Sequence, residues 1–136
     1  MNYNERVLNE FFNPENVGVI KGASGKGKVV SETDREIMKI YIQVEDEVIT
    51  NALFQTFGCV AAIACTSVVT KMMIGKHVDD IAHITAEEIL SELGGLPEQK
   101  LYCATLAVET AKDAIVSYES RKKGIKRQND DNDDED

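Results

Sequence analysis

The chain has 136 residues, a formal net charge of -9 and 43% hydrophobic residues, enough for one domain with a buried core. Six of the 24 acidic residues lie within residues 130–136, which leaves 18 acidic against 15 basic residues elsewhere. This small excess of acidic residues gives no support for a nucleic-acid partner. The polar first residues lack a signal-peptide pattern, and no run approaches the roughly 18 apolar residues of a membrane span. We therefore expect a cytoplasmic protein without a membrane partner.

The first half of the chain carries one helical pattern and then strand patterns. Apolar spacing predicts a helix over residues 4–12, which ends at Asn13-Pro14. Residues 22–28 predict a flexible loop. They nearly match a phosphate-binding loop, but Val29 stands where Ser or Thr would bind magnesium, so a hairpin or connecting loop is the preferred interpretation.

Two alternating segments, residues 37–44 and 48–57, predict a hairpin. The polar residues between them, Glu45-Asp46-Glu47, predict its turn. A third strand is expected to begin at Val29-Val30. These strands would form a small antiparallel sheet with one face to be covered.

The second half of the chain predicts the covering helices. Helices are expected over residues 61–74, ended by Gly75, and from a capping box at Thr85 through Leu93, with a short turn over 78–82 between them. A long helix over residues 100–122 is expected to bury a stripe of Leu101, Thr105, Val108, Ala111, Ala114 or Ile115, and Tyr118. Strands followed by helices predict an α+β fold: a small three-stranded antiparallel sheet packed by several helices, with a long C-terminal helix.

The domain is expected to occupy residues 1–123. Residues 124–136 predict a disordered acidic tail, because blocks of like charge cannot bury enough apolar surface to fold. The alternative for this tail is an acidic interaction segment.

Three cysteines, an odd number without a signal peptide, predict reduced thiols. Cys59 and Cys103 each lie near the start of a predicted helix, where the backbone N–H groups favour a low-pKa thiolate that can bind metal or react. Cys65 lies in an apolar helix, where a packed core residue is expected. His77 and His83 predict surface histidines, because their spacing does not match a zinc motif.

Three separated stretches, residues 13–18, 54–64 and 96–103, occur in the order seen in one known family. Together with the helix over 107–118, they resemble the U-type iron-sulfur cluster assembly scaffold, the IscU/NifU N-terminal domain family, over about residues 1–123. The resemblance implies a three-stranded antiparallel sheet packed by helices, with metal ligands at one tip. It implies a non-enzymatic function: assembly of a [2Fe-2S] cluster from iron and from sulfur supplied by a cysteine desulfurase, and transfer to recipient apoproteins.

The family's ligands are three cysteines, an aspartate two residues after the first, and a histidine before the third. Cys59 and Cys103 match the second and third cysteines, while Asp34, Glu36 and Tyr102 stand at the first cysteine, the aspartate and the histidine. The resemblance therefore implies Cys59, Cys103, Asp34 and Glu36 as cluster or iron ligands, Tyr102 as a further oxygen ligand, and Cys103 as persulfide acceptor. Alternatively, a homodimer would offer four thiolates, Cys59 and Cys103 from each protomer, to a bridging cluster.

The stretch Leu96-Pro97-Glu98-Gln99-Lys100 keeps both ends of the family's Leu-Pro-Pro-Val-Lys motif, which implies an Hsp70-type chaperone as a further partner. Two other functions stay open. One is an adaptor that binds a desulfurase or chaperone without building a cluster. The other is a carrier of persulfide or of zinc, which is also expected as a metal in the purified protein.

Overall fold

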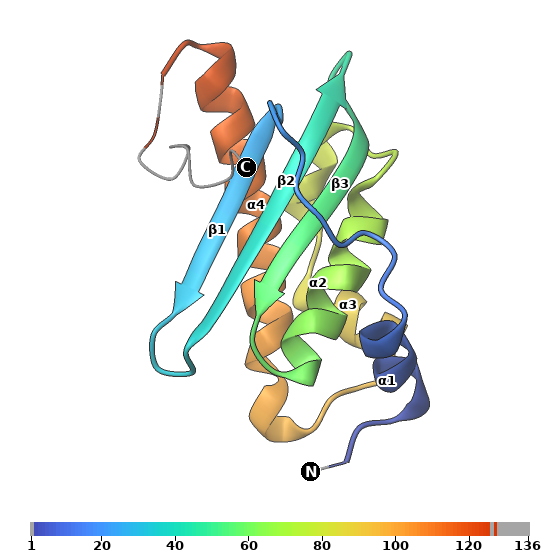
Figure 1. The fold of residues 1–136 in the computed structure, drawn as a ribbon. Helices are drawn as coiled ribbons and strands as arrows, with labels where there is room; N and C mark the ends of the chain where they lie inside the picture. The colour runs from blue at the N-terminus through green and yellow to red at the C-terminus, as the bar shows by residue number, and fades with distance from the viewer. Residues whose placement is uncertain (1, 126, 128–136) are drawn as a thin grey trace.

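The computed structural model describes residues 2–125 and 127, and it contains one three-stranded antiparallel sheet (Figure 1). Its order is β1-β2-β3, formed by β1 (Gly25–Ser31), β2 (Glu36–Glu45) and β3 (Val48–Phe57). The predicted α+β class and the predicted hairpin are therefore confirmed. Among the described residues, no helix has both the length and the apolar character that crossing a membrane requires.

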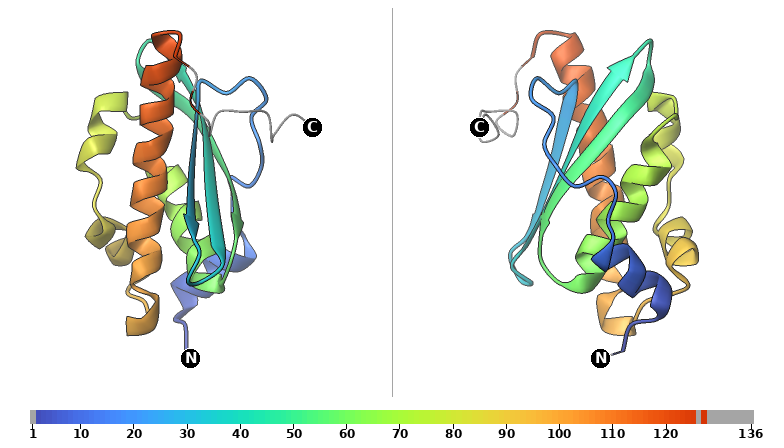
Figure 2. Two further views of the ribbon diagram at one scale, coloured as in Figure 1. Left: turned by 90° about the vertical axis from the view of Figure 1, so that its left-hand side faces the viewer. Right: turned by 45° about the vertical axis from the view of Figure 1, so that its right-hand side comes forward.

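Two helices, α2 (Val60–Met73) and α4 (Tyr102–Lys122), cover one face of this sheet. The helices α1 (Glu5–Phe12) and α3 (Ala86–Leu93) pack against α2, and the short 3-10 helices η1 (Val78–His83) and η2 (Glu98–Lys100) contact α4. The edge-on view in Figure 2 shows the long α4 lying along the sheet, with the chain between α1 and β1 on the opposite side. That connecting chain is tied to β3, because the Gly18 N–H donates to the Phe54 carbonyl at 2.9 Å.

The core lies between the sheet and α2 and α4. Alternate side chains of β2, Met38, Ile40 and Ile42, are fully buried, as the sequence pattern predicts for a strand with one covered face. The helix α2 packs against α1, α3, α4 and the sheet, so ten of its 14 residues are buried. This arrangement explains why α2 is apolar around most of its circumference.

The prediction of a flexible loop over residues 22–28 is wrong from Gly25 onward, because Gly25 to Lys28 belong to β1. A Cβ on Gly25 would lie 2.5 Å from the Ala114 carbonyl oxygen, and one on Gly27 would lie 2.6 Å from the Ala114 backbone nitrogen. Neither glycine has a positive φ. These glycines therefore allow β1 to approach the backbone of α4, and a turn does not require them.

The predicted buried stripe of α4 is partly wrong. Leu101 is 41% exposed and Thr105 is exposed. The buried face contains mainly small residues: Cys103, Ala104, Ala107, Val108, Thr110, Ala111, Ala114, Ser117 and Tyr118. Because β1 presents glycines to α4, the two backbones come too close for large side chains between them.

Several local predictions are confirmed. The turn after β2 places Asp46 and Glu47 at φ 53° and 65°, the left-handed conformation of a tight hairpin turn. Tyr118 and Lys122 at the end of α4 both donate hydrogen bonds to the Glu47 carboxylate. The capping box between Thr85 and Glu88 begins α3. The predicted tail over residues 124–136 lies outside the described residues except for 124, 125 and 127.

Candidate metal centre

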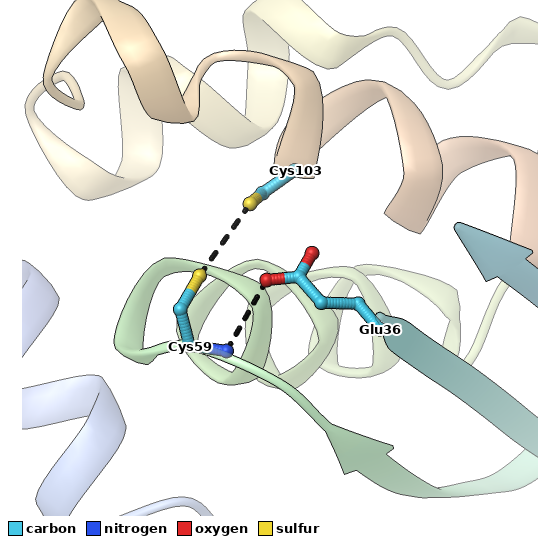
Figure 3. A group of neighbouring side chains, drawn as sticks. All are labelled: Glu36, Cys59 and Cys103. Atoms are coloured by element: carbon cyan, nitrogen blue, oxygen red, sulfur yellow. Dashed lines mark hydrogen bonds between the residues drawn. The ribbon is translucent and has the colours of Figure 1, made fainter. Parts of the chain in front are cut away.

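Three ligand-bearing residues from different elements meet at one end of the sheet. Glu36 is the first residue of β2, Cys59 directly precedes α2, and Cys103 lies in the first turn of α4. The start of β2 pairs with the end of β3, through Ile37 and Phe57, so Glu36 and Cys59 lie at the same edge. One ligand atom from each of Glu36, Cys59 and Cys103 lies within 4.8 Å of the others (Figure 3).

The two sulfur atoms have the spacing of ligands on one metal ion. Cys59 Sγ lies 3.9 Å from Cys103 Sγ, and both cysteines are free. A tetrahedral ion with metal–sulfur bonds of about 2.3 Å would hold two thiolates about 3.8 Å apart. The folded chain therefore presents this pair at almost the required separation.

Glu36 supplies a carboxylate that the protein leaves half satisfied. The residue is only 3% exposed, and its Oε2 accepts a hydrogen bond from the Cys59 N–H at 3.3 Å. Its Oε1 is buried and has no hydrogen-bond partner among the described residues. A buried carboxylate oxygen without a partner is unfavourable, and a cation beside the sulfur pair would satisfy it. The residues present therefore fit a bound metal.

The two thiols have opposite electrostatic surroundings. The sulfur atoms of Cys59 and Cys103 share a hydrogen bond, and this contact, assisted by the Ala62 backbone N–H, lowers the pKa of Cys59 from 9.0 to about 7 despite partial burial and the nearby Glu36. The same contact and burial raise the pKa of Cys103. The expected low-pKa thiolate is therefore present at Cys59, beside the start of α2, while Cys103 keeps its proton.

This difference predicts selective alkylation of the metal-free protein. At neutral pH, iodoacetamide should modify half-buried Cys59 well before Cys65 and Cys103, both 0% exposed. The rate at Cys59 should rise with pH through a midpoint near 7, because the thiolate is the nucleophile. Peptide mass spectrometry over a pH series checks this. Equal modification of the three cysteines, or a Cys59 midpoint above pH 8.5, would contradict it.

The structure does not bring Asp34 into this group. Asp34 lies in the exposed turn between β1 and β2, and its carboxylate accepts a hydrogen bond from Ser31 Oγ at 2.9 Å. Tyr102 is half-buried next to Cys103. Burial is the largest cause that raises the pKa of its phenol, and the charge of Glu36 adds to it, so Tyr102 keeps its proton. Of the two predicted carboxylate ligands, only Glu36 therefore lies with the cysteines.

The remaining cysteine and the histidines lie outside the candidate centre. Cys65 is fully buried, and burial raises its pKa to about 12, which confirms the predicted core position. His77 and His83 are exposed, as predicted. His77 Nδ1 accepts a hydrogen bond from the Asp79 N–H and so helps to begin η1.

The model of the NifU-like N-terminal domain family matches residues 2–124 of this chain. The chain belongs to this family. It is 44% identical over 116 residues to "Iron-sulfur cluster assembly scaffold protein IscU 1" of Archaeoglobus fulgidus, covering 85% of this chain and 76% of that protein. It is 41% identical over 130 residues to the protein named "Iron-sulfur cluster assembly scaffold protein IscU" in Rickettsia prowazekii, covering 93% and 98%.

A longer relative and a solved structure agree with the assignment to the NifU-like family. "Nitrogen fixation protein NifU" of Azotobacter chroococcum is 38% identical over 118 residues, which are 85% of this chain but only 38% of that protein. The crystal structure of a NifU-like N-terminal domain from Brucella abortus superposes with a TM-score of 0.69 at 20% identity, covering 87% of this chain and 94% of the other. That structure supports the fold. The relatives with the IscU name are called scaffold proteins.

One residue of this NifU-like centre does not follow from the ligand pattern of the sequence. Lys100 ends η2, and its Nζ lies 5.8 Å from the centre of the Tyr102 ring. Burial is the largest single influence and would lower the pKa of Lys100, but the charge of Cys59, a hydrogen bond to Cys59 and smaller charge contributions together raise it. Lys100 therefore supplies a positive charge beside the cysteine pair. Only its place in the Leu96–Lys100 motif could have drawn attention to it.

Proposed function

We propose that this protein is an iron-sulfur cluster assembly scaffold that holds iron between Cys59, Cys103 and Glu36. The observation that carries the proposal is that the buried Oε1 of Glu36 has no hydrogen-bond partner among the described residues and lies beside two free cysteines. The names of the relatives from Archaeoglobus fulgidus and Rickettsia prowazekii support the same function. A [2Fe-2S] cluster would be the cargo of the scaffold.

The three side chains suit this cargo in different ways. Thiolates are the usual ligands of iron-sulfur clusters, while a carboxylate oxygen is a harder ligand that suits ferric iron. A cluster with one oxygen ligand should be released more readily than one held by cysteines alone, as a transfer protein requires. Asp34 and Tyr102 stay proposed as secondary ligands: Asp34 would need a movement of its turn, and Tyr102 would need to lose its phenolic proton.

Sulfur would enter this site from its exposed side. Cys103 is the proposed persulfide acceptor, and because it is 0% exposed, a donor would have to approach past half-buried Cys59. Lys100 would offset the negative charge that gathers on Cys59. We propose a cysteine desulfurase as donor and apoproteins as recipients, in the cytoplasm.

Two further interactions follow from the same proposal. Three ligands from one chain leave one position of a four-ligand cluster open, which solvent or a second protomer of a homodimer would fill.

Residues 96–100 include η2 and lead directly into α4, with Glu98 and Gln99 exposed. This segment is the proposed docking site for an Hsp70-type chaperone.

Anaerobic reconstitution tests the function directly. The protein is incubated with ferrous iron, cysteine, a cysteine desulfurase and dithiothreitol, which reduces the persulfide sulfur to sulfide. It is then desalted and mixed with an apo-ferredoxin. We expect visible absorption bands, iron and sulfide bound in equal amounts, and transfer of both to the ferredoxin. A desalted protein without bound iron and sulfide would contradict a scaffold function.

One observation favours a second candidate, a carrier of zinc. The sulfur pair and Glu36 offer three ligands to a single ion, a common arrangement for zinc with an open fourth position. Native mass spectrometry would then find zinc without an iron chromophore. An adaptor that needs no metal would instead keep its affinity for the desulfurase in a Cys59→Ser, Cys103→Ser double variant.

A further inference from the structure

Gly58 lies between the end of β3 and Cys59, against the side chain of Glu36. A Cβ at this position would lie 2.8 Å from Glu36 Cγ, 3.1 Å from Cδ and 3.2 Å from Oε2. Real Cβ atoms essentially never approach other heavy atoms as closely as the first of these distances. The backbone of Gly58 is not left-handed, so no turn requires a glycine here. What the glycine provides is the space that the Glu36 side chain occupies.

The nature of the obstructing atoms distinguishes Gly58 from the other two crowded glycines. At Gly25 and Gly27, an added Cβ would meet backbone atoms of α4, which cannot move without disturbing the fold. At Gly58, the nearest atoms all belong to one side chain. The adjoining turn, residues 32–35, is exposed, so a displaced carboxylate has solvent into which it can move. An alanine at position 58 should therefore move Glu36 and leave the fold intact.

We propose that Gly58 is a positioning residue for the metal centre, because its missing side chain lets the Glu36 carboxylate lie beside Cys59 and Cys103. This inference rests on the proposed function, which makes Glu36 a ligand. Glu36 Oε2 accepts a hydrogen bond from the Cys59 N–H, and Oε1 has no partner among the described residues. Few polar contacts therefore hold the carboxylate in the site, and the space above Gly58 determines whether it fits there.

Anaerobic titration with Co²⁺, followed by its absorption spectrum, tests this role without iron or sulfide. Thiolate-to-cobalt charge-transfer bands report Cys59 and Cys103, and the ligand-field bands report the remaining ligands. We expect Gly58→Ala to melt within a few degrees of the wild type and to bind Co²⁺ about tenfold more weakly, as is typical when a residue that orients a ligand is changed. Its thiolate bands should remain while its ligand-field bands shift.

A double-mutant cycle shows whether Gly58 acts through Glu36. In a Glu36→Ala background, the alanine at position 58 has nothing to displace, so the affinity for Co²⁺ should change less than twofold. An equal loss in both backgrounds, an unchanged affinity in Gly58→Ala, or loss of folded structure in Gly58→Ala would each overturn the inference. Wild-type protein without thiolate bands would overturn the metal-binding function itself, and the inference with it.

Discussion

Cys103→Ala should weaken metal binding by about 100-fold or more. Structural zinc sites gain about 10–16 kcal/mol from roughly four ligands, so one ligand contributes about 3 kcal/mol, and 1.4 kcal/mol is a factor of ten. Cys103 supplies one of the two sulfurs, 3.9 Å from the other. Competition of Zn²⁺ or Co²⁺ against a chromophoric chelator measures the affinity. The fold should persist, because alanine is only slightly smaller than cysteine.

Cys65→Ala is the matched control for this variant. Cys65 is also a fully buried cysteine on a helix, but it does not belong to the group of ligands. Its replacement should leave the affinity for Zn²⁺ within about twofold of the wild-type value. Among the carboxylates, Asp34→Ala should likewise lower the affinity for Zn²⁺ much less than Glu36→Ala does. An equal loss in the Cys65 and Cys103 variants would mean that the metal site lies elsewhere.

Gly27→Ala should destabilise the fold by about 3 kcal/mol or more, because overpacking against fixed atoms leaves no low-energy rearrangement. A Cβ on Gly27 would overlap the Thr110 carbonyl oxygen and lie 2.6 Å from the Ala114 nitrogen. Both are backbone atoms of α4, so β1 and α4 would have to separate. Urea unfolding followed by circular dichroism measures the loss in free energy of unfolding.

Gly22→Ala provides the comparison for that experiment. Gly22 has a φ of +67°, and apart from its chain neighbours no described residue has an atom within 4 Å of the added Cβ. Alanine there should cost only about 1–2 kcal/mol, the strain of a left-handed residue. Equal stability of the Gly22 and Gly27 variants would contradict the close packing of β1 on α4.

Local sequence patterns predict much of this fold. The alternation of residues 37–44 and 48–57, the capping box at Thr85 and the burial of Cys65 all depend on neighbours close in sequence. Such features follow from side-chain periodicity and backbone hydrogen bonding. They are the parts of the prediction that the structure confirms with small shifts at element ends.

Contacts between distant segments explain the errors. In the sequence alone, Gly25 and Gly27 suggest a loop, whereas in the structure they lie against α4. The face of α4 that contacts them is the buried one, and it does not include Leu101 or Thr105. The raised pKa of Cys103 arises from a hydrogen bond to Cys59, 44 residues away. No local pattern contains that information.

Local sequence patterns also fail to predict which of Asp34 and Glu36 lies in the candidate centre. Residues two apart share a face only while the chain is extended. Arg35 between them has φ 56°, a left-handed conformation, so the alternation ends there and Asp34 belongs to the exposed turn. The family resemblance could therefore pair both carboxylates with Cys59, whereas the structure brings only Glu36 to it.

The content of iron and acid-labile sulfide in protein purified without oxygen shows whether this chain holds an iron-sulfur cluster. The protein would be expressed in full, purified in an anaerobic chamber, and analysed together with the Cys59→Ala, Cys103→Ala double variant. The scaffold function predicts iron and sulfide in equal amounts in the wild type and neither in the double variant. Wild-type protein that carries zinc alone, or no metal and no sulfide, would contradict it.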